Sequence, residues 1–344
     1  MSPTTMMILI SSLATGTIIT ASSYHWLMAW IGLEMNTLAI IPMISKQHHP
    51  RATEAATKYF LTQAAASATI LFASTLNAWQ SGTWDIMNSS DPTANMLLTM
   101  ALAMKLGLAP MHFWLPEVLQ GSTMKTALII TTWQKLAPMS LILQTNNNLS
   151  TTTLLMMGMI SSTLGGWAGL NQTQTRKIMA YSSIAHLGWM ATITTIMPNI
   201  MILNLLLYLL MTTSMFYTLI LINSKNIKDM ATSWTTSPTT TTLTMLILLS
   251  LGGLPPLTGF TPKWLILEEL TMQNLTTTAT IMAMSALLSL FFYLRLSYTS
   301  TITLSPNTTM TKHKWRFKQT TKALPLTTTL PLSILMLPLT PMLM

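Results

Sequence analysis

The first candidates for chemistry are charged residues inside long apolar stretches of the 344-residue chain: Glu34, Lys105, Lys135 and Lys263. A charge at the centre of a membrane-spanning helix costs about 3 kcal/mol or more, so ionisable residues there are expected to be functional. Burial favours the neutral form of a lysine, whereas a nearby carboxylate favours its charged form. We therefore predict a lateral row of proton carriers. The alternative is a structural Glu34–Lys105 ion pair, with the Lys135 side chain reaching towards the membrane surface.

Two histidines, His112 and His186, also fall at membrane depth. His112 lies two residues after Pro110, and His186 lies in the segment YSSIAHLGW. Imidazole changes charge near neutral pH and can pass a proton between neighbours. A single histidine among apolar residues can equally be a hydrogen-bonded packing residue. Relay and packing therefore both remain open for each histidine.

The composition indicates that these residues belong to a polytopic membrane protein. Hydrophobic residues make up 50% of the chain and charged residues only 7%, whereas a soluble domain carries about 25% charged residues. The net charge of +9 does not predict nucleic-acid binding, because the basic residues lie in loops between apolar runs. The chain has no cysteine, which excludes disulfides and iron–sulfur ligation. It also lacks dinucleotide and P-loop motifs and a His/Cys metal cluster, so we expect no cofactor or metal.

Apolar runs of about twenty residues, the length of a membrane-spanning helix, occur about eleven times. The ninth run is too long for one straight helix and contains Gly253, Pro255, Pro256 and Pro262, so it is predicted to form two half-helices. The predicted fold is an all-α bundle with spans at 3–22, 25–44, 57–79, 94–116, 124–145, 151–171, 177–197, 200–223, 239–269, 275–298 and 324–343.

The loop charges predict an orientation. When the loops are assigned alternately to two sides, every loop Lys and Arg falls on the side of the N-terminus, while Asp85 and Asp91 fall on the other. Such segregation is what the positive-inside rule predicts. It favours an odd number of spans, with the N-terminus inside and the C-terminus outside.

The fourth and ninth spans contain related segments. Gly107–Glu117 (GLAPMHFWLPE) and Gly253–Lys263 (GLPPLTGFTPK) share Gly, Leu, Pro and Pro at the same positions. These spans would cross the membrane in opposite directions, which is typical of inverted repeats with broken helices. A broken helix in a membrane is tolerated where it is buried in protein or lines a wet cavity. The predicted organisation is one repeat at about 1–146, a second at about 150–300, a basic connecting segment at about 301–323 and a final helix at about 324–343.

The connecting segment is the longest polar stretch. Its basic residues, with Trp315 and Phe317, are compatible with an amphipathic helix on the membrane surface or with a plain basic loop. Either form would attract anionic phospholipids such as cardiolipin.

Several motifs carry a resemblance that covers essentially the whole chain: WIGLEMNTLAIIP, KLGLAPMHFWLPEV, WQKLAP, YSSIAHLGWM and GLPPLTGFTPKW. They resemble the family of antiporter-like membrane-arm subunits of mitochondrial NADH–ubiquinone oxidoreductase (respiratory complex I). The resemblance implies a proton-translocating module with a discontinuous helix in each half. By motif match, Glu34 and Lys105 take the place of the family's glutamate–lysine pair, Lys135 that of its bridging lysine and Lys263 that of its second-half lysine.

The resemblance also implies a setting for the chain. It would be a multi-pass inner-membrane subunit of a translocating enzyme, with its N-terminus in the matrix and its C-terminus in the intermembrane space. NADH, FMN, the iron–sulfur clusters and ubiquinone would be bound by other subunits. The expected partners are other membrane-arm subunits, phospholipids, protons and water, and no nucleic acid. The alternatives are a stand-alone cation/proton antiporter of the related family and a purely structural membrane spacer.

Overall fold

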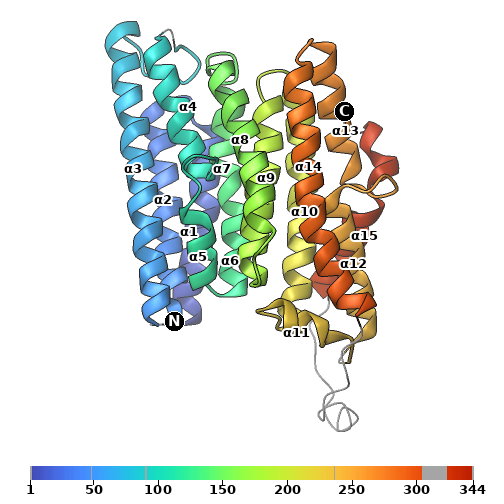
Figure 1. Ribbon diagram of the computed structural model, residues 1–344. Helices are drawn as coiled ribbons and strands as arrows, with labels where there is room; N and C mark the ends of the chain where they lie inside the picture. The colour runs from blue at the N-terminus through green and yellow to red at the C-terminus, as the bar shows by residue number, and fades with distance from the viewer. Residues whose placement is uncertain (1, 48, 90, 236, 304–323, 343–344) are drawn as a thin grey trace. The chain divides into compact units, whose positions relative to one another are not determined.

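The computed structural model describes residues 2–47, 49–89, 91–235, 237–303 and 324–342, which are almost entirely helical (Figure 1). Within these ranges, β-pairing is limited to the isolated bridges His25–Asp85 and Gln174–Asn226. The all-α prediction is therefore confirmed. The chain divides into two compact units: unit 1, Met1–Ser161 with Met190–Pro198, and unit 2, Ser162–Trp189 with Asn199–Met344.

Unit 1 holds the helices that surround the first three predicted site residues (Figure 1). α1 packs along α2, α2 along α3, and α3 contacts both α4 and α5; α7 contacts α1, α2 and α4. The bounds are α1 Pro3–Ser22, α2 Trp26–Ile44, the 3₁₀ turn η1 Ser45–Gln47, α3 Pro50–Ser81, α4 Pro92–Leu106, α5 Trp114–Gly121, α6 Met124–Thr131 and α7 Trp133–Gln144. The boundary between the units falls within α8 (Thr151–Gly169) and α9 (Thr175–Ile193).

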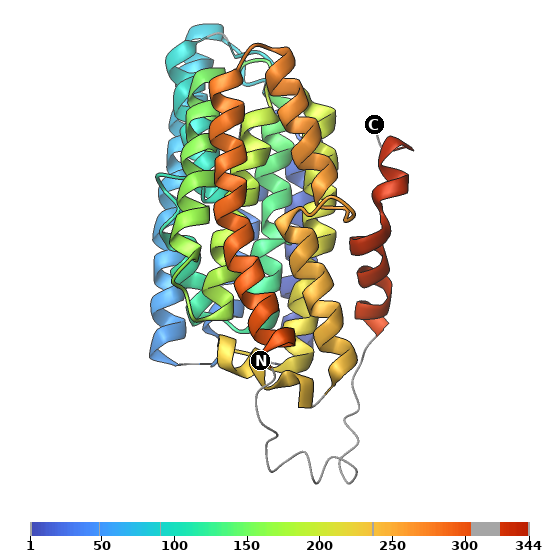
Figure 2. The ribbon, with the colours of Figure 1, turned by 45° about the vertical axis from the view of Figure 1, so that its right-hand side comes forward.

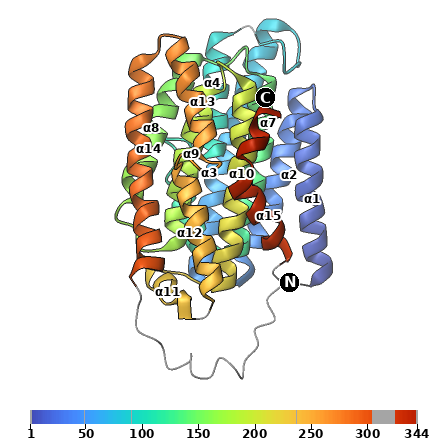
Figure 3. The ribbon, with the colours of Figure 1, turned by 90° about the vertical axis from the view of Figure 1, so that its right-hand side faces the viewer.

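Unit 2 is built around α12 and α14. Figure 2 shows α14 running beside α12 and α13. α15, the red helix in Figure 3, contacts α12. The bounds are α10 Pro198–Ile222, α11 Ile227–Ala231, η2 Ser233–Thr235, α12 Pro238–Gly252, α13 Phe260–Met272, α14 Thr276–Ser297, η3 Tyr298–Ile302, α15 Leu324–Leu335 and η5 Leu337–Met342. Of the described helices, α1, α2, α3, α10 and α14 with η3 are long and apolar enough to cross a membrane.

Coil interrupts the chain at both clusters of glycine and proline. α4 ends at Leu106 and α5 begins at Trp114, while α12 ends at Gly252 and α13 begins at Phe260. The start and end of α12 and the start of α13 each lie 146 residues after those of α4 and α5, which is the spacing of the shared Gly and Pro residues, whereas α13 ends 151 residues after α5. Each break therefore produces two half-helices in place of one continuous span.

A glycine in the left-handed conformation ends the first half-helix in each case. Gly107 has φ 79° and Gly253 has φ 82°. The Gly107 N–H donates to Ala103 O at 2.9 Å, and the next amide, of Leu108, donates to the same carbonyl at 2.9 Å. These bonds satisfy carbonyls that the last helical turn leaves without partners. Glycine suits this position because a side chain disfavours positive φ.

A further interruption was not predicted. The expected span 124–145 is divided into α6 and α7 at Thr132, which has φ −109° and ψ −72°. Pro138 has no N–H to donate to the preceding turn. The hydroxyls of Thr131 and Thr132 donate to carbonyls of α6, Ala127 O at 3.0 Å and Leu128 O at 2.7 Å. Such bonds compete with regular helical bonding and bend helices, which accounts for a break that lacks glycine.

Two other boundaries differ from the prediction. α3 begins at Pro50, not at 57, because His49 caps its first turn and extends the helix beyond the apolar run. The predicted final helix 324–343 is divided into α15 and η5, with proline at Pro331 and Pro341. Of the predicted connecting segment, residues 304–323 lie outside the described part of the chain.

The glycine at the second break supplies a test of this geometry. Gly253→Ala is expected to destabilise the full-length protein by more than the about 1–2 kcal/mol that positive φ costs an L-residue, because an added Cβ would also lie 3.0 Å from Lys263 Cδ. Gly82→Ala is the matched control, with φ 71° and open space around the added Cβ. Thermal unfolding in lipid nanodiscs measures both. Equal losses would contradict the close approach of Lys263.

The start of α4 gives a pH-dependent test. The Asp91 carboxylate accepts from Thr93 N at 3.1 Å and Thr93 Oγ1 at 2.6 Å, and these bonds hold the Asp91 pKa below its ordinary value. Its stabilising effect is therefore fully present above the unfolded-state pKa and lost as pH falls through the lower folded-state pKa. Asp91→Asn should lower the melting temperature at neutral pH, and the difference should shrink in acid. A difference independent of pH would refute this account of the cap.

Candidate functional site

Lys135 binds the end of the first half-helix in unit 1. Its side chain is buried, and Nζ donates to Leu106 O at 2.6 Å. Nζ also lies 5.4 Å from the centroid of the Trp114 ring, while Trp114 Nε1 donates to Met104 O at 3.2 Å. The C-terminal end of a helix carries partial negative charge, which an ammonium group stabilises. Lys135 of α7 thus satisfies the carbonyl of Leu106, and Trp114 of α5 adds a second bond to Met104 O, which also accepts from the Gly107 N–H at 3.1 Å.

Lys105 is buried in the same region but makes no comparable bond. It lies in the last turn of α4 with 4% of its surface exposed. In the part of the chain that the structure describes, its Nζ has no hydrogen-bond partner. Glu34 acts on it electrostatically, but no ion pair within 4.0 Å joins the two described side chains. The Glu34 carboxylate instead accepts from Thr37 Oγ1 at 2.9 Å.

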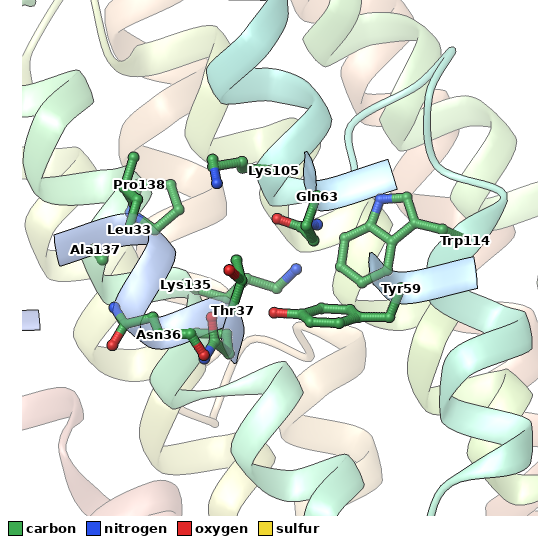
Figure 4. A pocket seen from close by; sticks show the side chains of 11 residues that line it. Leu33, Asn36, Thr37, Tyr59, Gln63, Lys105, Trp114, Lys135, Ala137 and Pro138 are labelled. Atoms are coloured by element: carbon green, nitrogen blue, oxygen red, sulfur yellow. The ribbon is translucent and has the colours of Figure 1, made fainter. Parts of the chain in front are cut away.

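A small cavity connects the two lysines. Its volume is about 10 Å³, at the lower limit for one water molecule. The cavity is lined by Leu33, Asn36, Thr37, Tyr59, Gln63, Lys105, Trp114, Gln134, Lys135, Ala137 and Pro138 (Figure 4). Sequence reasoning did not single out Asn36, Tyr59, Gln63 or Trp114. A signal was present for Asn36 and Gln63, since each is a polar residue inside a predicted apolar span.

Lys263 has the corresponding role in unit 2. Its Nζ donates to Gly252 O at 2.8 Å and lies at 3.4 Å from Leu251 O. Gly252 is the last residue of α12, as Leu106 is the last residue of α4. Each break is therefore closed by a lysine ammonium on the final carbonyl of the half-helix that precedes it.

The two histidines lie in different surroundings. His186 in unit 2 is buried, its ring centroid lies 5.6 Å from that of Tyr208, and the charge of Lys263 acts on it. His112 in unit 1 lies in the coil of the first break, with its ring centroid 4.3 Å from that of Phe113. The structure thus places Lys105 and Lys135 on one cavity of unit 1, with Glu34 in electrostatic range of Lys105, and in unit 2 it places Lys263 in electrostatic range of His186.

Two acidic residues outside this site, Glu54 and Glu117, form ion pairs on the surface. Lys58 Nζ lies 2.5 Å from Glu54 and 2.6 Å from Glu117, linking α3 to α5. All three side chains are exposed, so solvent screens both ion pairs and they contribute little to stability. Among the described residues, no group of three or more His, Asp and Glu is arranged to hold a metal ion.

Comparisons with known proteins identify the family of the chain. The model of the family "NADH:quinone oxidoreductase/Mrp antiporter, TM" matches residues 23–289, and that of "NADH dehydrogenase subunit 2 C-terminus" matches residues 290–344. NADH-ubiquinone oxidoreductase chain 2 of Salmo salar is 58% identical over 341 residues, which cover 99% of this chain and 98% of the relative. The chain belongs to the NADH-ubiquinone oxidoreductase chain 2 family.

Other relatives extend the family match. The chain 2 protein of Latimeria chalumnae is also 58% identical, with the same coverage. A chain in the structure of respiratory complex I from Thermus thermophilus with bound aureothin superimposes with a TM-score of 0.84 at 26% identity. That match covers 97% of this chain and 79% of the Thermus chain. This chain is therefore similar in fold and in sequence to a chain of that complex I structure.

The different bonding of the two lysines in unit 1 is testable by hydrogen exchange. Lys135→Met leaves Leu106 O without its donor, and a buried unpaired carbonyl costs about 1–3 kcal/mol. Amide exchange at the α4–α5 junction should therefore rise by about tenfold or more. Lys105→Met removes a buried charge that has no hydrogen bond to lose, so exchange at the junction should stay near the native rate. Equal acceleration in both variants would contradict the distinct roles assigned to the two lysines.

Proposed function

We propose that the chain is an antiporter-like membrane-arm subunit of a proton-translocating NADH–ubiquinone oxidoreductase, respiratory complex I. Proton translocation would use Glu34, Lys105, Lys135 and Lys263, with His186 and His112 as further relay groups. The observation that carries the proposal is the buried Lys105 ammonium, which has no hydrogen bond and faces a cavity shared with Lys135. The match to chain 2 relatives over 98% of the length of the Salmo salar protein supports the same assignment.

The different environments of the two lysines suggest how a proton would move. Lys135 is bound to Leu106 O, which stabilises its charge, whereas the charge on Lys105 depends on the groups around the cavity. Glu34 favours a proton on Lys105, and a charge on Lys135 opposes it. Moving one charge across 100 mV costs roughly 2.3 kcal/mol. A change of about two pKa units in a proton carrier, near 2.7 kcal/mol, is of the size needed to drive such a step.

The second unit would continue the row through Lys263 and His186. We infer that the units derive from inverted repeats at about 1–146 and about 150–300, followed by a connecting segment at about 301–323 and a final helix at about 324–343. The two half-helix pairs support this inference, because both first half-helices begin at proline and end before a left-handed glycine. Counting each broken helix once gives the proposed total of about eleven spans.

The proposed setting is the inner mitochondrial membrane. The segregation of loop Lys and Arg supports an N-terminus in the matrix and a C-terminus in the intermembrane space. NADH, FMN, the iron–sulfur clusters and ubiquinone would be bound by other subunits of the complex. The partners would be other membrane-arm subunits, phospholipids such as cardiolipin, protons and water, and no nucleic acid.

A stand-alone cation/proton antiporter and a structural spacer are the competing functions. Identity to chain 2 proteins along nearly their whole length disfavours the antiporter. Copurification with a flavin- and iron–sulfur-containing assembly would separate a complex subunit from an antiporter. The spacer is tested by removing the buried charges.

Neutralising Lys105 in the assembled complex is the decisive test of translocation. Lys105→Met, with Glu34→Gln as a second variant, should lower proton translocation in proteoliposomes by about tenfold or more, since both are placed as proton carriers. The exposed Lys125→Met is the control, because it also removes a lysine but lies outside the row. Assembled complex that pumps fully with both Lys105 and Glu34 neutral would refute the relay.

A further inference from the structure

The coil of the second break has an exposed part and a buried part. Between α12 and α13, Pro255 and Pro256 are exposed, whereas Thr258 and Gly259 are buried. A Cβ added to Gly259 would lie 1.8 Å from Ser250 O in α12, a separation that no side chain permits. Glycine at this position therefore allows the coil to fold back directly onto a carbonyl of α12, next to Thr258.

The Thr258 side chain binds the final helix of the chain. Its Oγ1 donates to Ser333 O in α15 at 2.5 Å, and both residues are fully buried. In Figure 2 the coil between α12 and α13 projects towards α15. α15 ends at Leu335, so Ser333 O is one of the last four carbonyls, which a helix leaves without intrahelical partners. A hydroxyl of the second break therefore supplies a bond that the end of α15 needs.

Few residues attach α15 to the rest of unit 2. Among its described residues, only Leu326 and Ser333 are buried. They lie seven positions apart, which is about two helical turns, so both fall on one side of the helix. The packed side of α15 is therefore narrow, and the bond from Thr258 forms a substantial part of its attachment.

Thr258 is also bonded to the helix that carries Lys263. Thr261 Oγ1, in the first turn of α13, donates to Thr258 O at 2.9 Å. Lys263 follows in the same helix, and its Nζ donates to Gly252 O at 2.8 Å. Thr258 therefore contacts α15 through its hydroxyl and α13 through its carbonyl. A displacement of α15 from the coil would thus reach the start of α13 and Lys263.

The first break has a different residue at the matching position. Thr258 lies 146 positions after His112, the offset that also relates Gly107 to Gly253. The His112 ring packs against that of Phe113, with 4.3 Å between the centroids. α15 lies beyond both proposed repeats, so the bond between Thr258 and α15 is an addition to the repeated architecture.

We propose that Thr258 is a positioning residue for the buried lysine of unit 2. Its bond to Ser333 O anchors the second break to the end of α15, and this anchor holds Lys263 on Gly252 O. The contribution of the anchor to proton translocation rests on the proposed function. The anchor itself rests only on the contacts of Thr258 within unit 2.

The test compares Thr258→Val with Thr258→Ser in the assembled complex. Valine has nearly the shape of threonine but no hydroxyl, so Ser333 O loses its donor, whereas serine keeps one. Amide hydrogen exchange over residues 253–263 should rise by about tenfold or more in Thr258→Val, because a buried carbonyl without a donor is destabilising. Proton translocation per NADH oxidised should fall by about tenfold or more in the same variant. Thr258→Ser should keep both near the native values.

Two further substitutions separate the anchor from general effects. Thr244→Val removes the hydroxyl of an equally buried threonine in α12, but that hydroxyl donates to Thr241 O in its own helix at 2.7 Å. It should leave exchange over residues 253–263 near the native rate. Ser333→Leu places a larger side chain at a fully buried position, so it should displace α15 and reproduce the exchange of Thr258→Val.

A double substitution tests whether Thr258 acts through Lys263. In a Lys263→Met background the bond to Gly252 O is already absent, so adding Thr258→Val should raise exchange at the start of α13 by much less than it does in the native chain. An equally large rise in both backgrounds would overturn the positioning of Lys263 by Thr258.

The outcomes separate this inference from the proposed function. Native exchange over residues 253–263 in both Thr258→Val and Ser333→Leu would overturn the anchor. An equal rise in Thr244→Val would overturn it in favour of general loosening of unit 2. Raised exchange with full translocation in Thr258→Val would overturn the role of the anchor in translocation. Full pumping by Lys105→Met, with raised exchange in Thr258→Val, would instead refute the relay and leave the anchor in place.

Discussion

The final carbonyl of a helix that stops inside the membrane is the constraint on which this site depends. The last turn of any helix leaves carbonyls without intrahelical partners, and lipid offers no water to satisfy them. At both breaks, the left-handed glycine and its following amide satisfy earlier carbonyls, and a lysine ammonium binds the last one, Leu106 O or Gly252 O. The positive charge of each lysine and the partial negative charge at the end of the broken helix therefore stabilise each other.

This constraint also distinguishes the two lysines of unit 1. The bond of Lys135 to Leu106 O fixes its ammonium at the helix end, next to the ring of Trp114. Lys105 is one residue before that carbonyl in the chain, so its own side chain points elsewhere and remains without a hydrogen bond. Lys135 therefore binds the end of α4. Lys105 instead lines the cavity, in the electrostatic field of Glu34.

Sequence reasoning recovered the features that depend on local chemistry. Pro110 and Pro116 predicted the first break, and Gly253 with the prolines that follow it predicted the second, because the loss of a backbone donor acts locally. The interruption at Thr132 was missed, because it arises from proline and threonine bonding within one helix and no glycine marks it. The acceptors of Lys135 and Lys263 were not predictable either. Lys135 binds a carbonyl 29 positions earlier in the chain, and only the folded packing of α7 against α4 brings these groups together.

Both breaks form the same type of bond between a lysine and a helix-end carbonyl, but the lysine comes from a different kind of element in each unit. Lys263 belongs to α13, the half-helix that follows its own break, so this lysine and its acceptor Gly252 O lie 11 positions apart on the two sides of one short coil. Lys135 belongs to α7, a separate helix that begins just after the interruption at Thr132. A small shift of α7 can therefore change the Lys135–Leu106 bond without refolding α4 or α5. Because Lys105 lines the same cavity as Lys135, such a shift would change the electric field at Lys105.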